Sequence, residues 1–344
     1  NLTVGGRTRD GKDATNELSY MCLKATEDTL AHQPGLSVRI HPDTPDEFMA
    51  AVTHLVSKGT GFPAIHSDNA GYQMLVNAGY EPEDARDWSN CGCVVPHFRK
   101  TGEWTSAANL NFAAALEFAT NEGKSRLSGK KIALDEKDPK TFSTYEEVEA
   151  AFYKQFAYLI KQAVISLITA QRLHVEMVPR PFMSACIEDC MKNGKDLTKG
   201  GAKYNIGPVI TGIGIAVVAN SLAAIKKLVF EEKSVTMAEI IDAINNNWEG
   251  YDELRAKVQA APKYGNDDDY VDDIAREIGN FFYQEVHKYK DINGNHFLSA
   301  FMGISNYLPT GKVLGATPDG RKATEPISEG VSPYVGTDTS TPLA

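Results

Sequence analysis

The residues with the clearest chemical potential are two cysteines, Cys91 and Cys93, in a run of small and β-branched residues. Positions 90–97 read Asn-Cys-Gly-Cys-Val-Val-Pro-His, so a glycine separates the thiols and a proline interrupts the run. By itself a Cys-x-Cys pair is weak evidence, because a buried free cysteine is more often a small inert hydrophobe. The tight loop predicted here nevertheless suits a thiol that is held for chemistry.

Several polar and glycine-rich segments accompany this loop along the chain. An apolar stretch at 62–65 runs into His66 and Asp68, and the acidic segment Glu-Asp-Ala-Arg-Asp-Trp at 83–88 leads into the cysteine loop. The later segments are Gly-Gly-Ala-Lys-Tyr-Asn at 200–205, Ala-Pro-Lys-Tyr-Gly-Asn-Asp at 261–267, Thr-Pro-Asp-Gly-Arg-Lys at 317–322 and Ser-Glu-Gly-Val-Ser-Pro at 328–333.

In this order the segments resemble the pyruvate formate-lyase superfamily of glycyl radical enzymes, and the resemblance covers the whole chain. It implies an α/β fold, part of a ten-stranded β/α barrel made of two antiparallel sets of five parallel strands and surrounded by helices. It also implies a single domain over residues 1–344 that is incomplete at both ends, because members of the superfamily are longer. The Arg-Val-x-Gly-Tyr type of motif around the radical glycine is absent from the sequence. We therefore expect a fragment of a longer chain, and the alternative is a natural truncation.

The resemblance assigns a radical role to one thiol. In the superfamily, an activating enzyme with S-adenosylmethionine and an iron-sulfur cluster installs a radical on a glycine, which here lies outside the chain. The radical passes to the loop cysteine, whose thiyl form takes hydrogen from a small organic substrate and triggers carbon-carbon or carbon-heteroatom cleavage. Cys93 matches the family's Gly-Cys-Val pattern and is the expected catalytic residue. No other bound cofactor is implied, and no metal.

Two departures from the family pattern bear on the reaction. The lyase itself has two adjacent cysteines, whereas Gly92 separates them here, which disfavours an acetyl-enzyme relay. Formate C-acetyltransferase activity on pyruvate and coenzyme A is therefore the alternative reading. A non-catalytic truncated chain that acts as an assembly partner is the other alternative.

The second departure is Val95, at the position where radical eliminases usually place a glutamate. General acid-base catalysis needs a titratable group within hydrogen-bond reach, which valine lacks. We expect Val95, His97 and Asp68 to contribute to the substrate site, with His97 or Asp68 replacing the carboxyl unless the reaction needs none. The competing interpretations are a solvated loop histidine for His97 and a helix cap for Asp68.

Three other groups of residues are interpreted as structural. Phe98, Trp104 and Phe112 could wall a bulky substrate, but core packing is favoured. Cys186 and Cys190, four apart on a predicted helix, lack further zinc ligands at suitable spacing and are expected in the core. The acidic run at 267–269 lacks the spacing of a calcium loop and is expected to cap a helix.

The composition excludes several classes of function. The formal net charge is -10 over 344 residues, which argues against nucleic-acid binding. The longest apolar stretch, 212–230, contains Lys226 and Lys227 and fails as a membrane helix. Five cysteines without small-scaffold spacing favour a reducing cytoplasm. The expected partners are a small-molecule substrate, the activating enzyme and a second copy in a homodimer.

The predicted elements alternate between strands and helices, as in an α/β protein. Strands are predicted at 37–41 and 62–65, and helices at 47–57 with Asp46 as cap, 109–121, 144–174, 221–230, 236–246 and 270–289. Thr144 and Glu147 form a predicted capping box. The Gly-Ile-Gly at 212–214 reads as a strand-to-helix turn, because the third glycine of a dinucleotide fingerprint is missing.

Overall fold

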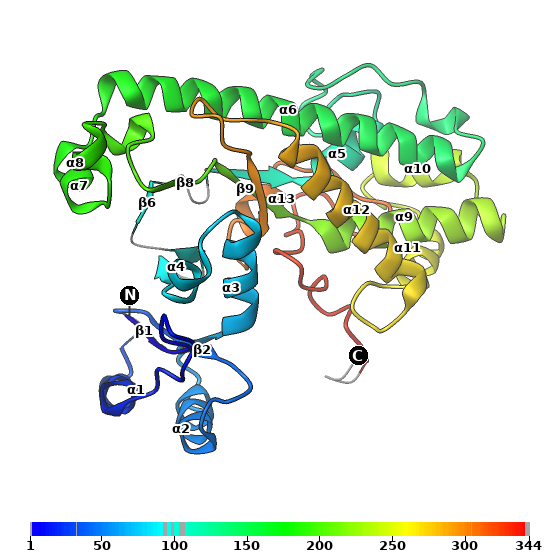
Figure 1. The fold of residues 1–344 in the computed structure, drawn as a ribbon. Coiled ribbons are helices and arrows are strands. Elements are labelled where there is room, and N and C mark those ends of the chain that lie inside the picture. The colour runs from blue at the N-terminus through cyan, green and yellow to red at the C-terminus, as the bar shows by residue number, and fades with distance from the viewer. Residues whose placement is uncertain are drawn as a thin grey trace. The chain divides into compact units, whose positions relative to one another are not determined.

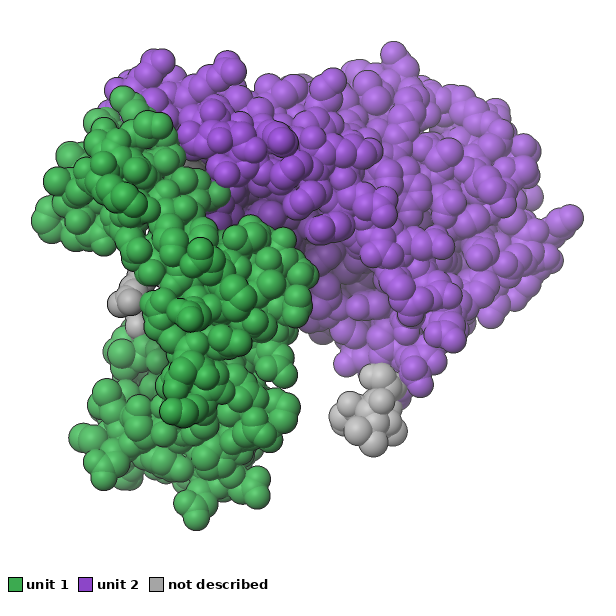
Figure 2. Space-filling model, viewed as in Figure 1, with its two compact units in different colours: residues 1–102, 179–205 green, residues 103–178, 206–344 purple. Residues whose placement is uncertain are grey.

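Figure 1 shows a computed structural model of the chain, which describes residues 2–31, 33–91, 95–97, 100–102, 107–303 and 305–340. Of residues 91, 95–97 and 102 only the backbone is described. The chain divides into two compact units, coloured separately in Figure 2. Unit 1 comprises residues 1–102 and 179–205, and unit 2 comprises residues 103–178 and 206–344. The expectation of a single domain stays a prediction.

Unit 1 is built on a three-stranded parallel sheet in the order β1-β2-β3. The strands are β1 (Leu2–Gly5), β2 (Leu36–Ile40) and β3 (Ala64–Ser67). Helix α1 (Glu17–Thr29) connects β1 to β2, and α2 (Asp46–Val56) connects β2 to β3. Parallel neighbours need such crossover connections, and the sequence of strand, helix, strand is the predicted α/β order.

The core of this sheet region comes from apolar faces of β2 and the two helices. Its buried members are Leu23, Leu36, Val38, Phe48, Val52 and Leu55. The predicted cap Asp46 is wrong, because Asp46 is the first helical residue and Pro45 occupies the N-cap without a side-chain hydrogen bond. The carboxylate still lies in the first turn, where the helix dipole favours negative charge.

The rest of unit 1 consists of short elements. These are α3 (Asp68–Asn77), α4 (Pro82–Arg86), β4 (Ser89–Cys91), β5 (Val95–His97), β6 (Thr101–Gly102), α7 (Pro181–Cys186), α8 (Cys190–Asn193), the 3-10 turn η2 (Leu197–Lys199) and β8 (Tyr204–Asn205). The expected common helix for Cys186 and Cys190 is wrong, since Asp189 has a left-handed backbone, φ 72°, that separates α7 from α8. Cys190 is buried as predicted, but Cys186 is exposed.

Unit 2 has its own three-stranded parallel sheet, in the order β10-β9-β7. The strands are β7 (Ala108–Asn111), β9 (Val209–Ile213) and β10 (Leu298–Phe301). The helical elements are α5 (Phe112–Ala119), η1 (Pro139–Thr141), α6 (Tyr145–Met177), α9 (Ile215–Ile225), the π-helical η3 (Lys226–Glu231), α10 (Met237–Asn245), α11 (Asp252–Ala260), α12 (Asp269–His287) and α13 (Tyr307–Gly311). Helix α6 packs along α5, and α12 packs along α9 (Figure 1).

A group of aromatic rings forms the centre of unit 2. Phe112 lies edge-on to Phe156 and Phe282, with ring centroids 4.5 and 4.9 Å apart. Such edge-to-face pairs add to the hydrophobic stabilisation of a core. The core assignment of Phe112 is therefore confirmed, whereas Phe98 and Trp104 lie outside the described residues.

Several element predictions in unit 2 need adjustment at their ends. The predicted helix at 109–121 begins three residues later, because Ala108–Asn111 pairs with β9 as a strand and Asn111 then caps α5. Thr144 caps α6 as predicted, but Glu147 accepts from the amide of Ser143 rather than that of Thr144. Gly214, with φ 93°, makes the predicted strand-to-helix turn, and the helix that follows starts at Ile215.

Candidate active site

The predicted cysteine loop is a β-hairpin in unit 1. Strands β4 and β5 pair antiparallel, with Cys91 opposite Val95. The chain therefore reverses between these two residues, as the sequence predicted from its small residues. Residues 92–94, including the expected thiyl residue Cys93, lie outside the described residues, and so do the side chains of Val95 and His97. The roles predicted for Cys93, Val95 and His97 stay predictions.

The residues just before the hairpin are held by a buried arginine, Arg39 of β2. Its guanidinium donates from Nη1 to the carbonyl oxygen of Trp88 at 2.6 Å and from Nη2 to that of Arg86 at 2.7 Å. The amide of Asn90 donates to Oγ1 of Thr3 at 3.1 Å. Three backbone groups that precede Cys93 are thus fixed to the parallel sheet of unit 1.

Asp68 is the carboxylate that accompanies Arg39. Its Oδ1 accepts from Nε of Arg39 at 2.7 Å, from Nη2 of the same residue and from Nε1 of Trp88 at 3.1 Å. Both side chains of the pair are buried. Burial lowers the pKa of Arg39, and the charge of Asp68 opposes that shift. The carboxylate therefore compensates a buried cation that also binds the chain next to the hairpin.

The capping interpretation of Asp68 does not hold, because the side chain of Ser67 caps α3 by accepting from the amide of Ala70. Asp68 is the first helical residue. A role in substrate binding stays a prediction for Asp68, and its Oδ1 is already engaged by Arg39 and Trp88.

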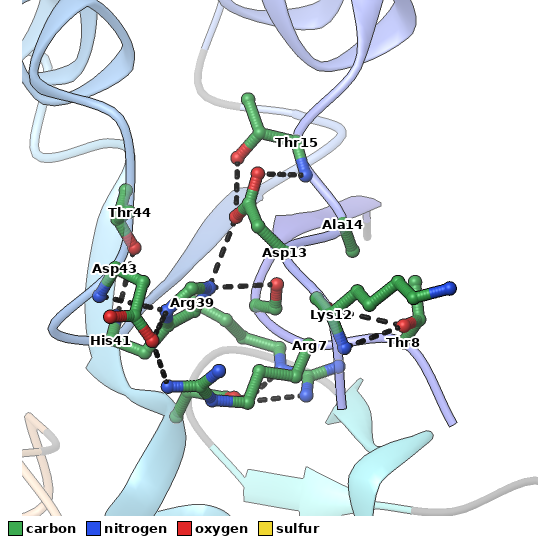
Figure 3. Close-up of polar contacts among 12 residues, drawn as sticks. Arg7, Thr8, Lys12, Asp13, Ala14, Thr15, Arg39, His41, Asp43 and Thr44 are labelled. Atoms are coloured by element: carbon green, nitrogen blue, oxygen red, sulfur yellow. Dashed lines mark hydrogen bonds and ion pairs between the residues drawn. The ribbon is translucent and has the colours of Figure 1, made fainter. Parts of the chain in front are cut away.

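A second polar group follows the carboxyl ends of β1 and β2 (Figure 3). The ring of His41 contacts Oδ1 of Asp13 and the carbonyl oxygen of Gly6 through Nε2, at 3.0 and 3.1 Å. Its Nδ1 accepts from the amide of Asp43, so the proton of the neutral ring is on Nε2. Arg7 forms an ion pair with Asp43 at 2.7 Å. Since these bonds engage both ring nitrogens, His41 serves to fix the loop after β1.

His66 of β3 is another polar residue of this sheet. It stands opposite Arg39 in the sheet register, and its ring lies edge-on to Trp88 at 6.2 Å. Nε2 is buried and has no hydrogen-bond partner among the described residues. Burial lowers the pKa of His66, which favours the neutral ring. A neutral imidazole with a free nitrogen can accept a hydrogen bond from a substrate or donate one to it.

A third polar group, which was not predicted from the sequence, is centred on Asp84 of α4. This buried carboxylate accepts from Arg9, Lys100, Lys203 and Tyr204. The only signal in the sequence was that Asp84 and the Lys-Tyr pair belong to two of the polar segments quoted above. Nothing in their types or spacing indicated that they meet.

Neither a metal site nor a membrane span is found in the part of the chain that the structure describes. No group of three or more His, Cys, Asp or Glu side chains there could hold a metal ion. No helix there is long and apolar enough to cross a bilayer.

The fold and the hairpin can now be compared with known proteins. The family described as pyruvate formate lyase-like matches residues 1–311. The chain belongs to this family. The expected resemblance to glycyl radical enzymes of the pyruvate formate-lyase superfamily is confirmed.

Individual members of the family resemble the chain over almost its full length. Trans-4-hydroxy-L-proline dehydratase of Clostridioides difficile is 36% identical, over 100% of this chain and 44% of its own length. Isethionate sulfite-lyase of Desulfovibrio desulfuricans (strain ATCC 27774 / DSM 6949 / MB) is 35% identical, over 100% of this chain and 42% of its own. The structure of the glycerol-bound B12-independent glycerol dehydratase from Clostridium butyricum superposes with a TM-score of 0.95 at 37% identity, covering 99% of this chain and 43% of that one.

These members of the pyruvate formate lyase-like family support the predicted fold class. In the described residues the strands make two separate three-stranded parallel sheets and two two-stranded pairs, and no closed barrel. The chain spans less than half the length of the relatives it matches.

Proposed function

We propose that this chain is the cysteine-loop part of a glycyl radical enzyme that cleaves a carbon-oxygen or carbon-sulfur bond in a small substrate. The observation that carries the proposal is the β4–β5 hairpin, whose connecting residues include Cys93, in a chain of the pyruvate formate lyase-like family. Relatives named as a dehydratase and a sulfite-lyase support elimination over acyl transfer. The glycine between Cys91 and Cys93 points the same way.

The thiol of Cys93 gives its hydrogen atom to a radical glycine, which a separate S-adenosylmethionine and iron-sulfur enzyme activates, so the sulfur-hydrogen bond breaks and a thiyl radical is left. Cys93 takes one hydrogen atom from a substrate carbon, so a carbon-hydrogen bond breaks and a sulfur-hydrogen bond forms. After the neighbouring carbon-oxygen or carbon-sulfur bond has broken, the same sulfur returns a hydrogen atom to the product. The thiyl state is thereby restored, and hydrogen is conserved at this residue over the cycle.

The proton that accompanies a leaving hydroxyl needs a titratable donor, and Val95 cannot supply it. His97 follows two residues later in β5 and is our candidate for that proton. His66 is our candidate for a hydrogen bond to the substrate, because its buried Nε2 has no partner among the described residues. The two assignments are separable by substitution.

The test is anaerobic activation of the complete polypeptide, followed by electron paramagnetic resonance and product analysis. Trans-4-hydroxy-L-proline, isethionate and glycerol are the first substrates to assay, and pyruvate with coenzyme A represents the acyltransferase alternative. Cys93→Ala should keep the glycyl radical signal and lose turnover, whereas Cys91→Ala, the matched control, should keep both. Turnover by Cys93→Ala, or formate release from pyruvate, would overturn the proposal. A complete polypeptide that acquires no radical signal favours the non-catalytic alternative.

A further inference from the structure

The carboxylate of Asp84 accepts four hydrogen bonds from side chains of unit 1. Its Oδ1 accepts from Nη2 of Arg9 at 2.9 Å and from Nζ of Lys100 at 3.1 Å. Its Oδ2 accepts from Nζ of Lys203 at 2.7 Å and from the hydroxyl of Tyr204 at 2.9 Å. The side chain is only 1% exposed. Four donors from three separate segments therefore converge on one buried anion.

The bond between Asp84 and Lys100 closes the base of the hairpin segment. These residues are 16 apart in sequence, and Cys93 stands between them. The paired strands β4 and β5 lie within the loop that this bond closes. A further bond joins the hydroxyl groups of Tyr80 and Thr101 at 3.2 Å, just outside it. The two ends of the cysteine segment are thus tied together by buried polar contacts.

The same carboxylate ties the hairpin base to a distant part of unit 1. Lys203 and Tyr204 belong to the Gly-Gly-Ala-Lys-Tyr-Asn segment. Strand β8, which begins at Tyr204, pairs in parallel with β6, which begins directly after Lys100. The ring of Tyr204 stacks on that of Tyr80, with centroids 4.3 Å apart. The segment after the hairpin is therefore held both by backbone pairing and by the shared anion.

The electrostatics favour a charged carboxylate at this place. Burial opposes ionisation, but hydrogen bonds from Lys203, Lys100 and Tyr204 hold the pKa of Asp84 well below its usual range. Lys100 is also buried, and the hydrogen bonds that it donates to Glu188 and Asp84 raise its pKa against the effect of burial. Loss of the Asp84 charge would remove an acidic contact of Lys100, whose Nζ also lies 3.0 Å from Glu188. Buried cations that lose a partner become strongly unfavourable.

We infer that Asp84 is a positioning residue that closes the base of the segment carrying Cys93 and thereby sets the position of the thiol. The inference rests on the proposed function and extends it to a residue that acts through the hairpin. A reacting atom must lie within a narrow distance of its target, and a displacement of about 1 Å can lower the rate ~100-fold. A loosened hairpin base displaces the thiol, and His97 of β5 with it, while leaving the radical glycine and His66 of β3 in place.

The test compares Asp84→Asn with Asp196→Asn in the complete, anaerobically activated polypeptide. Asparagine keeps the shape of Asp84 and removes the charge that holds Lys100 and Lys203. Asp196 is a matched control, because it also lies in unit 1 and accepts from Ser184 and Thr198, but far along the chain from the hairpin. Asp84→Asn should lower kcat by about 10- to 100-fold with KM within about twofold and an undiminished glycyl radical signal. Asp196→Asn should leave kcat unchanged.

Hydrogen exchange of the same variants separates this inference from the proposed function. In Asp84→Asn the amides of residues 88–91 and 95–102 should exchange at least about tenfold faster, while those of α2 stay unchanged. This result is expected whether or not Cys93 carries a radical, so an inactive wild type would sink the proposed function alone. If Asp84→Asn fails to fold, Tyr204→Phe, which removes one of the four donors, should give a smaller change of the same kind. Unchanged exchange at the hairpin, or a rise in KM at constant kcat, would overturn the positioning role.

Discussion

Arg39 and Asp68 form a buried ion pair that lies beside the entry to the cysteine hairpin, with Nε and Oδ1 2.7 Å apart. The same guanidinium binds the carbonyl oxygens of Trp88 and Arg86, and the same carboxylate binds the indole of Trp88. The pair is thus the point at which β2, α3 and the residues before β4 meet. Loss of the pair should lower the stability of unit 1 and loosen the entry to the hairpin.

We expect Asp68→Asn to lower the free energy of unfolding of unit 1 by about 3–5 kcal/mol, because it removes the charged partner that is hydrogen-bonded to the buried Arg39. Hydrogen exchange of the β1, β2 and β3 amides measures this loss. Asp28→Asn is the control, since it removes the exposed pair between Lys24 and Asp28 on α1, at 2.6 Å. That change should leave the free energy of unfolding nearly unchanged, because water screens an exposed pair. Equal decreases in the free energy of unfolding in both variants would show that the buried pair stabilises unit 1 no more than the exposed pair does.

Gly71 of α3 provides a test of the packing against Trp88. A Cβ at this position would lie 2.5 Å from Cε2 and Cζ2 of the indole ring, which is held by Asp68. Gly71→Ala should therefore destabilise unit 1 by about 1–3 kcal/mol through overpacking. The matched helical control is Gly279 of α12, where a Cβ meets nothing within 4 Å.

Gly279→Ala should raise the free energy of unfolding by about 0.5–1 kcal/mol, because alanine restricts the unfolded chain and favours helix. Urea titration followed by hydrogen exchange of α3 and α12 measures both effects separately. Stabilisation by Gly71→Ala would mean that the indole can move away from the helix without cost.

His66 should make the stability of unit 1 depend on pH. Burial lowers its pKa from the ordinary value of 6.5, so the unfolded chain binds the proton at a higher pH than the folded chain does. The contribution of His66 is therefore fully present above pH 6.5 and is lost as the pH falls through 6.5 toward the folded pKa. The measurement is hydrogen exchange of β3 between pH 7.5 and pH 5, corrected for intrinsic exchange.

His66→Gln should remove this part of the pH dependence, while His54→Gln, at an exposed histidine that contacts Glu27 at 2.9 Å, should keep it. In the activated polypeptide His66→Gln should also raise KM more than it lowers kcat, in line with a hydrogen bond to the substrate. An unaltered pH profile in His66→Gln would place the titrating group elsewhere.

His97→Gln tests whether His97 replaces the glutamate that is missing at Val95. If His97 moves a proton, kcat should fall by about 10²- to 10⁴-fold. The pH-rate profile should lose the limb that reports this histidine. The double variant Val95→Glu/His97→Gln should recover part of the rate, since it restores a carboxyl at the family position. A single variant with full activity and an unchanged profile would show that the reaction requires no acid or base at His97.

Much of unit 1 could be predicted from local patterns. The alternation of polar and apolar residues at 37–41 and the helical spacing at 47–57 correspond to β2 and α2 within one residue, since each reflects a periodicity of the backbone itself. The strand predicted at 62–65 lies two residues further on, at Ala64–Ser67. The predicted cap at Asp46 failed for a local reason, because Pro45 already sets the N-cap conformation.

The sequence by itself determined the family, the reversal of the chain around Cys93 and the order of strands and helices, because these depend on residues close together along the chain. Only the tertiary structure decided which charges meet. Asp84 contacts Lys203 across 119 residues and Asp68 contacts Arg39 across 29. An aspartate in a sequence has many possible cations, and the pairing is decided when packing buries both groups together and makes an unpaired charge too costly.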